Sequence, residues 1–373
     1  MNHTLEKATG LKSGYPFLPI NLAKISPDLG PVLIVRIVVN ALTCPLIILL
    51  NILVIVTVKT KPQLRTKSNI ALACLATTDL VVGLIVQPLH IASSALLFQG
   101  KTDTFCSLFN KSYFVSLKCI RASLCHLFLI SFDRYVAIKR PFAYENKVTE
   151  GCIIFSSGLA WAAAILLPIQ HLRADMHISK VIAVYLPLLI LLSAITYFNV
   201  SIYKEVRRAE KQIAANQVSL DAKEKLLKNK KAFYTTITVL LSLFLCYVPI
   251  NIFCYTFNLF KESIPIKVKY TVLGLVSLLP VLNSLFNPLI YVARIRYFRV
   301  AFIQLLSQKT TSQAEELERK IFRSRQVGVI SDVGQRENVR ANREEQQGIE
   351  AFNNGHETTV RTQPQDVYEE STM

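Results

Sequence analysis

SYFVSLKCIRASLCHLFLISFDRY, residues 112–135, is the stretch on which the fold depends. Its first 21 residues, 112–132, form an apolar run that contains only two charges, Lys118 and Arg121, and the triplet Asp133-Arg134-Tyr135 ends it. A bilayer core is about 30 Å thick and is crossed by roughly 20 helical residues. The run is therefore predicted to be a membrane-spanning helix.

Six further apolar runs flank this one, two before it and four after it. The only formal charge in them is Asp79, and backbone polar groups that face lipid must form hydrogen bonds within their own segment, as they do in a helix. The sequence therefore predicts an all-α membrane protein, a seven-transmembrane helix bundle over residues 31–293. The six runs are 37–58, 70–98, 152–169, 181–203, 232–260 and 270–293, of which 152–169 is the shortest at 18 residues.

Composition supports this class. The chain has 373 residues, of which 51% are hydrophobic and only 18% charged, which argues against a soluble fold. The net charge of +17 could suggest nucleic acid, but residues 1–304, the hydrophobic part, hold a balance of +20 and the remainder −3. A nucleic-acid partner is not expected, because the basic residues do not share a domain with a polar surface.

Orientation follows from the loops. The connections 59–68, 133–150 and 204–231 are rich in lysine and arginine, and 204–231 holds nine of them. The positive-inside rule then places these loops and the tail in the cytoplasm and residues 1–30 outside the cell. The sequon Asn2-His3-Thr4 makes Asn2 a glycosylation candidate on that outer side. The predicted location is the plasma membrane, with the lipid bilayer as the surroundings of the bundle.

Residues 294–306 place basic and apolar side chains at helical spacing, with Phe298, Phe302 and Leu305 or Leu306 on one side. This pattern predicts an amphipathic helix on the inner leaflet. From 307 to 373 the chain is polar, which predicts a disordered cytoplasmic tail. Its last residues, with Ser371 and Met373 in the key positions, match a PDZ-domain ligand, and kinase and arrestin sites are expected at Thr310, Thr311, Ser312, Thr358 and Thr359.

Several polar side chains lie inside the predicted spans, where they cost free energy and are functional candidates. Asn283, Asn287 and Tyr291 recur every four residues and therefore line one helix face. Two interpretations remain open: a wet pocket or a small hard cation beside Asp79, or hydrogen bonds that hold helices together. The other members of the set are Asn51, Ser123 and Ser284.

The order of these motifs resembles that of the rhodopsin-like G-protein-coupled receptors over roughly residues 31–303. One set falls in each span: Asn51-Ile52-Leu53-Val54, Leu75-Ala76-Thr77-Thr78-Asp79, Asp133-Arg134-Tyr135, Trp161, Pro187, Pro249, and Asn287-Pro288-Leu289-Ile290-Tyr291 followed by Phe298.

The resemblance implies roles for the matching residues. Arg134 would be the switch that Asp133 cages at rest and that contacts the G protein when released. Pro249 would kink the sixth span. Asn287 and Tyr291 would move inward on activation. The remaining implied positions are Tyr135, Tyr247 and Pro288 in activation, and Asp79, Ser123, Asn283, Ser284 and Asn287 as a pocket for an allosteric Na⁺, the only cofactor expected.

Departures from the family pattern are also informative. Tyr247 stands where tryptophan is usual, Ile195 where the fifth-span tyrosine is usual, and Asn229 where an acid often locks the switch arginine. These changes predict a weak resting lock and some ligand-independent activity. The family's outer disulfide is predicted to be absent, because Phe109 holds the third-span position and the loop 170–178 has no cysteine, so no disulfide is expected.

The ligand is not named by the sequence, but two designs are disfavoured. Amine receptors carry an aspartate where this chain has Ser116, and opsins carry a lysine where it has Val281. With a short N-terminus and a short second outer loop, a small molecule or short peptide is the expected ligand. The candidate pocket residues are His90, Ser116, Ile120, Arg121 and Tyr247.

Lys118 and Arg121 are the unusual residues of the third span. Arg121 could anchor an anionic ligand, but it lies about 140° around the helix from Ser116. The alternative is that Arg121 faces a neighbouring helix and bonds to carbonyls or hydroxyls. Both interpretations remain open.

The leading function is therefore a receptor that couples an extracellular ligand to a heterotrimeric G protein. The alternative, a multi-pass transporter or channel, predicts an inverted repeat or acids in several spans, and only Asp79 is deep. An enzyme is not expected, because no paired acid and base or metal cluster is apparent.

Overall fold

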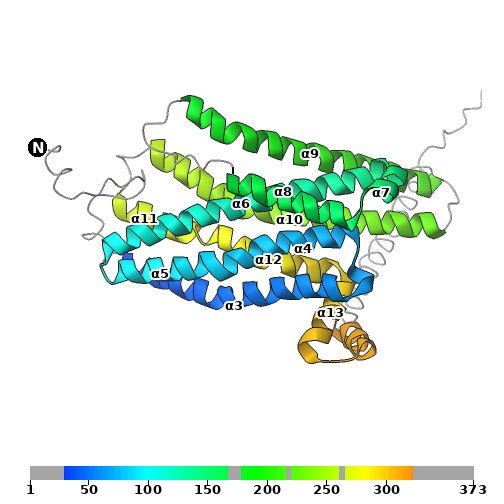
Figure 1. Ribbon diagram of the computed structural model, residues 1–373, viewed down its shortest axis with the longest axis horizontal. Coiled ribbons are helices and arrows are strands. Elements are labelled where there is room, and N and C mark those ends of the chain that lie inside the picture. Colours follow the sequence, from blue (N-terminus) through cyan, green and yellow to red (C-terminus); the bar gives the residue numbers. More distant parts are fainter. Residues whose placement is uncertain (1–28, 167–177, 216–219, 260–264, 322–373) are drawn as a thin grey trace, which may run out of the picture. The chain divides into compact units, whose positions relative to one another are not determined.

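A computed structural model describes residues 29–166, 178–215, 220–259 and 265–321. The chain divides into two compact units, Met1–Leu305 and Leu306–Met373. The described part of the first unit is a bundle of long helices that run alongside one another (Figure 1), and it contains no strand. Predicted features at Asn2, Thr358, Thr359, Ser371 and Met373 lie outside the described residues.

The predicted spans appear as helices or as short series of helices. The second span is continuous from α4 through a π-helical turn to α5, and the seventh is divided between α11 and α12. The elements in order are α3 (Gly30–Thr60), η2 (Pro62–Leu64), α4 (Lys67–Val81), η3 (Val82–Val86), α5 (Gln87–Phe98), α6 (Thr102–Lys139), α7 (Pro141–Lys147), α8 (Glu150–Leu166), α9 (Ile178–Ala215), α10 (Leu220–Leu259), α11 (Ile266–Val276), α12 (Leu279–Arg294) and α13 (Arg296–Ser307).

Length and hydropathy agree with seven crossings. Six helical segments of the described chain are long and apolar enough to span a membrane, and a seventh is added if α7 and α8 count as one span. These two helices meet at a bend of 85°, and α8 alone has 17 residues. The run 152–169 is therefore the weakest span in the structure as it is in the sequence.

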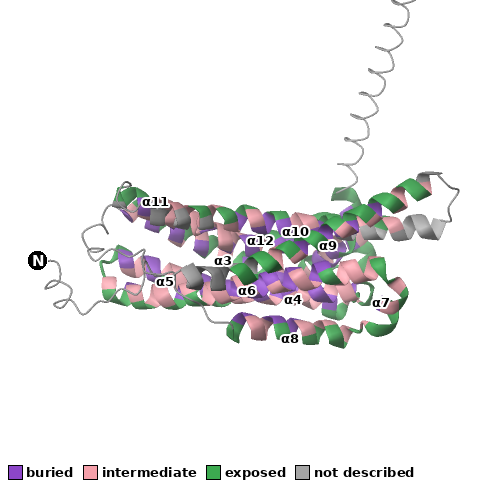
Figure 2. Cartoon of the chain, turned by 90° about the horizontal axis from the view of Figure 1, so that it is seen from above, coloured by how far each residue is buried: buried purple, intermediate pink, exposed green. Residues whose placement is uncertain are grey.

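The distribution of side chains is that of a membrane protein. Large apolar side chains such as Leu42 and Leu245 are 65% and 73% exposed, whereas Asn51 and Asp79 are at most 1% exposed. Figure 2 shows buried residues along the inner sides of the helices, with exposed ones on the outside. Lipid can cover apolar side chains but cannot satisfy polar ones, which explains this arrangement.

The fourth span is attached by polar contacts as well as by packing. The indole Nε1 of Trp161 on α8 donates to Thr77 Oγ1 at 3.4 Å, and His126 Nε2 lies 2.7 Å from Ser157 Oγ. His126 and Trp161 rings also meet edge to face, with centroids 6.5 Å apart. These contacts fix α8 against α4 and α6.

The long helical extensions predicted from the basic loop 204–231 are present. Helix α9 continues to Ala215 and α10 begins at Leu220. Two ion pairs join neighbouring helices there, Lys139 with Glu205 and Lys230 with Glu210. In both pairs each side chain is more than 20% exposed, so each pair stabilises the bundle only weakly.

Helix α13 confirms the amphipathic segment predicted over 294–306. Phe298 and Phe302 are 0% and 5% exposed, and the Phe298 ring lies 6.1 Å from that of Tyr291. Of the two leucines left open, Leu305 packs against the core and Leu306 is 58% exposed.

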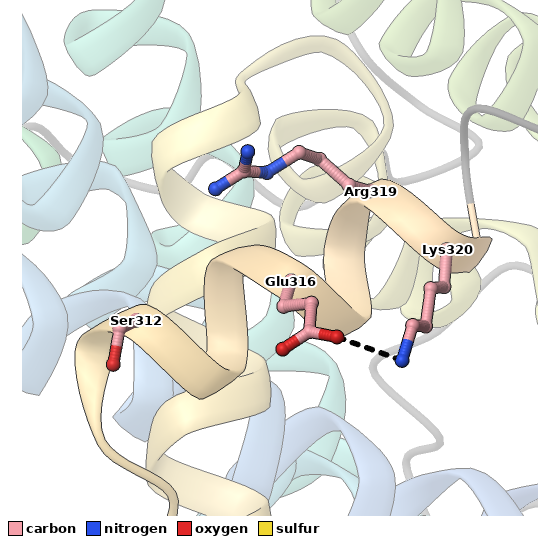
Figure 3. Close-up of a pocket in the computed structure, with 4 residues that line it drawn as sticks. All are labelled: Ser312, Glu316, Arg319 and Lys320. Carbon is pink, nitrogen blue, oxygen red and sulfur yellow. Dashed lines mark ion pairs between the residues drawn. The ribbon is translucent and has the colours of Figure 1, made fainter.

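The second unit corrects one expectation. Disordered chain was expected from residue 307, but residues 311–321 form a helix. Glutamates four residues before a basic side chain support it, with Glu316 and Lys320 2.8 Å apart and Glu315 and Arg319 3.7 Å apart. The shallow hollow in Figure 3 lies on this helix alone and is lined by Ser312, Glu316, Arg319 and Lys320. It is a surface of one helix rather than a site between elements.

Replacing Gly83 with leucine is expected to destabilise the bundle. A Cβ at this position in η3 would lie 2.9 Å from Ile48 Cγ1 and 3.5 Å from the Ile48 backbone nitrogen, so α3 would have to move. Overpacking of this kind costs about 1–3 kcal/mol. The thermal midpoint of the purified protein measures it. The matched control is Gly158→Leu on α8, where a Cβ meets nothing within 4 Å and the midpoint should not change.

Candidate functional site

The bundle centre is built around Asp79 on α4. Its carboxylate is 1% exposed and accepts a hydrogen bond of 2.8 Å from Asn287 Nδ2 on α12. These residues are 208 positions apart in the sequence. Their contact joins buried polar side chains of the second and seventh spans.

Further hydrogen bonds extend this contact to neighbouring helices. Asn51 Nδ2 on α3 donates to the Ser284 carbonyl at 3.1 Å. Ser242 Oγ on α10 donates to Asn283 Oδ1 at 3.4 Å. Ser123 on α6 shares a hydroxyl contact of 3.0 Å with Thr78 on α4. Sequence reasoning missed Thr78 and Ser242, although each is a hydroxyl inside an apolar run.

The geometry suits both interpretations of these residues. They join five helices, as interhelical hydrogen bonds would, and they also place oxygen atoms around one buried carboxylate. Asn287 Oδ1 is buried and has no hydrogen-bond partner, so it remains free to accept. A small hard cation prefers such oxygen ligands, and the residues fit it. Asp79, Ser123, Asn283, Ser284 and Asn287 are all at most 4% exposed. Asp79 would supply the charge, and the amides and hydroxyls would complete the coordination.

The inner end of α6 carries the predicted switch in a paired state. Arg134 binds Asp133 Oδ2 through Nε at 3.1 Å and Nη2 at 2.6 Å. The second carboxylate oxygen accepts a hydrogen bond of 2.8 Å from Tyr144 Oη on α7. Both carboxylate oxygens of Asp133 therefore accept hydrogen bonds, and the Arg134 guanidinium is held by the residue that precedes it in the sequence.

Tyr144 is a partner of Asp133 that sequence reasoning missed. It is 7% exposed, and Lys67 Nζ lies 4.7 Å from its ring centroid. Burial and the neighbouring Asp133 raise the pKa of its hydroxyl, so it stays protonated and donates. The only signal was an aromatic residue 11 positions after Asp133 in a polar loop.

Replacing Tyr144 with phenylalanine is expected to raise ligand-independent signalling about two- to fivefold, because one hydrogen bond to a charged group is lost. Nucleotide exchange at equal surface expression measures it. Phe142→Leu is the control, since Phe142 on the same helix is 87% exposed and should not affect the switch. An unchanged basal rate in the Tyr144 variant contradicts the proposed role.

The remaining activation residues occupy different surroundings. Tyr291 is fully buried and its hydroxyl makes no hydrogen bond. Tyr247 packs against the main core cluster, two residues before Pro249 of α10. The Tyr135 ring lies 5.0 Å from that of Phe198 on α9. Tyr197 also meets Tyr135 but is 60% exposed, and Ile195 is the buried residue instead. Pro288 lies within α12.

Lys118 contacts the neighbouring helix α8. Its ammonium group donates to the carbonyl of Ile165 in the last turn of α8 and lies 5.2 Å from the Phe114 ring centroid. Arg121 is partly buried one turn further along α6.

The candidate ligand residues do not form one cluster. Ser116 Oγ donates to the carbonyl of Ser112 in its own helix at 2.8 Å. Ile120 and Tyr247 both pack against the main core cluster. His90 on α5 and Arg36 on α3 each lie about one turn from Gln87 and Asn40, through which these two helices contact each other. Arg36 was missed because it lies one residue before the apolar run 37–58.

Seven of the eight cysteines have side chains that the structure describes, and these seven are free thiols. Cys106 packs beside Phe109 at the outer end of α6, against a cluster that includes Leu29 and Leu97. Among the described residues, Cys106 is therefore held by apolar packing and not by a disulfide.

Comparison with known proteins agrees with this geometry. The model of the family "7 transmembrane receptor (rhodopsin family)" matches residues 50–179 and 170–291. The histamine H2 receptor of Rattus norvegicus is 28% identical over 287 residues, which cover 70% of this chain and 76% of the relative. The human histamine H2 receptor is 28% identical over 312 residues, which cover 72% and 81%. The D(1B) dopamine receptor of Rattus norvegicus is 33% identical over 153 residues, which cover 41% and 31%.

These matches favour a receptor over a transporter or channel, because the members of this family signal through G proteins. The matched range contains the Asp79 network and the Asp133–Arg134 pair. The chain belongs to the rhodopsin family of seven-transmembrane receptors.

Proposed function

We propose that this G-protein-coupled receptor acts in the plasma membrane, with residues 1–30 outside the cell and the tail in the cytoplasm, and responds to a small molecule or short peptide. The supporting observation is the switch at the inner end of α6. Arg134 is held by Asp133, and Asp133 is held in turn by Tyr144. Such a contact can open without unfolding any helix, so a small shift of α7 or α6 would free Arg134 for a partner.

The Asp79 network is the proposed link between the outer and inner halves of the bundle. It joins α3, α4, α6, α10 and α12 through short polar contacts. A rearrangement of one helix therefore changes the hydrogen bonds of the others. Na⁺ bound at Asp79, with Ser123, Asn283, Ser284 and Asn287, would favour the resting arrangement.

The proposed ligand is not an amine held in the manner of amine receptors. Two relatives are named for histamine and dopamine. Position 116 of this chain is a serine whose hydroxyl is used within its own helix. An ammonium group would therefore find no carboxylate there, and exchange should respond to neither histamine nor dopamine through this position.

The decisive experiment uses the full chain in lipid nanodiscs with purified heterotrimers of each G-protein class. We expect the wild-type chain to accelerate guanine-nucleotide exchange in at least one class. Arg134→Gln should reduce the rate about tenfold, since a charge-assisted contact is worth roughly 1.5–3 kcal/mol. Lys147→Gln, on the same cytoplasmic side, is the control. No acceleration by wild-type or Asp133→Asn chains in any class contradicts the proposal.

Further proposed partners act at the ends of the chain. Kinases and arrestin would recognise Thr310, Thr311, Ser312, Thr358 and Thr359, and a PDZ domain would bind the terminus through Ser371 and Met373. Asn2 would carry a glycan. Glycosidase treatment of Asn2→Gln and wild-type receptor, compared by gel mobility, tests both the glycan and the outer position of the N-terminus.

A further inference from the structure

Arg36 on α3 is a cation inside the bundle rather than at its lipid surface. The residue is 8% exposed, and it lies on the same helix face as the fully buried Asn40 and Asn51. Ile34, Val35 and Val38 occupy the opposite, outer face and are 42–49% exposed. The side chain therefore does not reach lipid headgroups along the outside of the helix.

Two other helices surround Arg36. A Cβ built on Gly274 of α11 would lie 3.5 Å from Arg36 Cδ, so α11 passes close to its side chain. On α5, Gln87 contacts Asn40 of α3, and His90 and Arg36 each lie about one turn further out on their own helices. Arg36 therefore lies where the first, second and seventh spans meet, about 9 Å along α3 from its first residue.

The guanidinium lacks a counter-ion there. Its Nε is buried and makes no hydrogen bond, and no acid among the described residues forms an ion pair with it. In the described outer half of the bundle, Asp103 in the first turn of α6 is an acidic residue. The charge of Asp79 is engaged deeper in the bundle with Asn287. A buried, unpaired arginine is costly, and arginine binds carboxylates with two parallel hydrogen bonds.

The surroundings of Arg36 are polar on the inner side and apolar on the outer side. Toward the bundle centre, Asn40 Nδ2 donates to the Arg36 carbonyl at 2.8 Å, and Gln87 Nε2 donates to Thr43 Oγ1 at 2.8 Å. The buried Gln87 Oε1 has no partner. Toward the outer end lies an apolar cluster of Leu29, Val32, Leu33, Leu97 and Phe105, with Tyr270 packed against it.

We propose that Arg36, with His90 on the neighbouring α5, binds the carboxylate of a small extracellular ligand at the outer end of the bundle. This assignment rests on the proposed receptor function and specifies its ligand class. The sequence suggested Arg121 as the residue that binds an anionic ligand. This proposal assigns that role to Arg36 on α3.

The test is a thermal-shift measurement on full-length receptor in neutral phosphatidylcholine nanodiscs, with 3-phenylpropionate as probe and 3-phenylpropanamide as its uncharged match. We expect the carboxylate to raise the thermal midpoint of the wild type and the amide to leave it unchanged. Arg36→Gln should lose the shift, and Arg36→Lys should keep a smaller one. Lys101→Gln, between α5 and α6, should keep the full shift.

Equal shifts by acid and amide, a shift retained in Arg36→Gln, or no shift in the wild type overturn the proposal. If Arg36→Gln does not fold, His90→Gln and Arg36→Lys still must weaken the response. A second arm uses nanodiscs that contain phosphatidylglycerol. Stabilisation of the wild type over Arg36→Gln by this lipid alone would assign the site to a headgroup phosphate and overturn the soluble ligand. Basal nucleotide exchange, measured in parallel, separates loss of this site from failure of G-protein coupling.

Discussion

Replacing Asp133 with asparagine is expected to raise ligand-independent nucleotide exchange about five- to tenfold at equal surface expression. This increase is larger than the one expected for Tyr144→Phe. Asp133 and Arg134 are only 9% and 15% exposed, so their contact is poorly screened by water. Asparagine keeps the shape of the side chain but removes the charge that holds the guanidinium. Tyr144 loses its acceptor charge in the same step.

Two matched variants make this prediction specific. Glu205→Gln removes an exposed ion pair with Lys139 on the same cytoplasmic side, and its effect should stay below about twofold. In an Arg134→Gln background, Asp133→Asn should bring no increase, because the group it releases is gone. A basal rate that stays at the wild-type value in Asp133→Asn shows that this pair does not restrain the receptor.

Replacing Asp79 with asparagine should remove the sodium dependence of stability completely. A ligand that binds only the folded state at ten times its dissociation constant adds about 1.4 kcal/mol, or roughly 2–6 °C in the thermal midpoint. We expect wild-type receptor to melt higher in sodium chloride than in the chloride of a large organic cation at equal ionic strength. In Asp79→Asn the two midpoints should coincide, because the carboxylate is the only formal charge among the five residues of the network.

The control for general destabilisation is Asn199→Ala. Asn199 is a buried amide on α9 that donates to Ser131 Oγ at 3.1 Å, away from Asp79. Its loss should lower the midpoint but leave the sodium shift intact. A wild-type receptor without a sodium shift would leave hydrogen bonding between helices as the role of the network, and a shift that persists in Asp79→Asn would place the cation elsewhere.

The fold could be predicted because its signals are local. Each signal lies within a few turns of one helix, as the apolar runs, the Asp133-Arg134-Tyr135 triplet and the Asn287–Tyr291 motif do. Spacing at helical period also identified Phe298 and Phe302 as the buried side of α13. The helix over 311–321 was missed because its polar composition hid the glutamate–basic pairs that stabilise it.

Side chains that act across helices were harder to predict. Tyr144 looked like an ordinary loop residue, yet it completes the Asp133 contact. Lys118 was recognised only as an unusual cation of the third span, and the structure shows that it donates to a carbonyl of α8. Arg36 lies one residue outside the predicted apolar run 37–58, and only its burial and the approach of α11 show that it is enclosed.

The sequence by itself determined that the chain crosses a membrane with helices and which polar residues lie within them, because hydropathy and charge are properties of each segment alone. Only the tertiary structure decided which of those residues meet. Asn287 reaches Asp79 across 208 positions, and Tyr144 rather than a residue of α10 closes the switch. Such contacts depend on the rotation and axial offset of each helix, which packing against its neighbours sets.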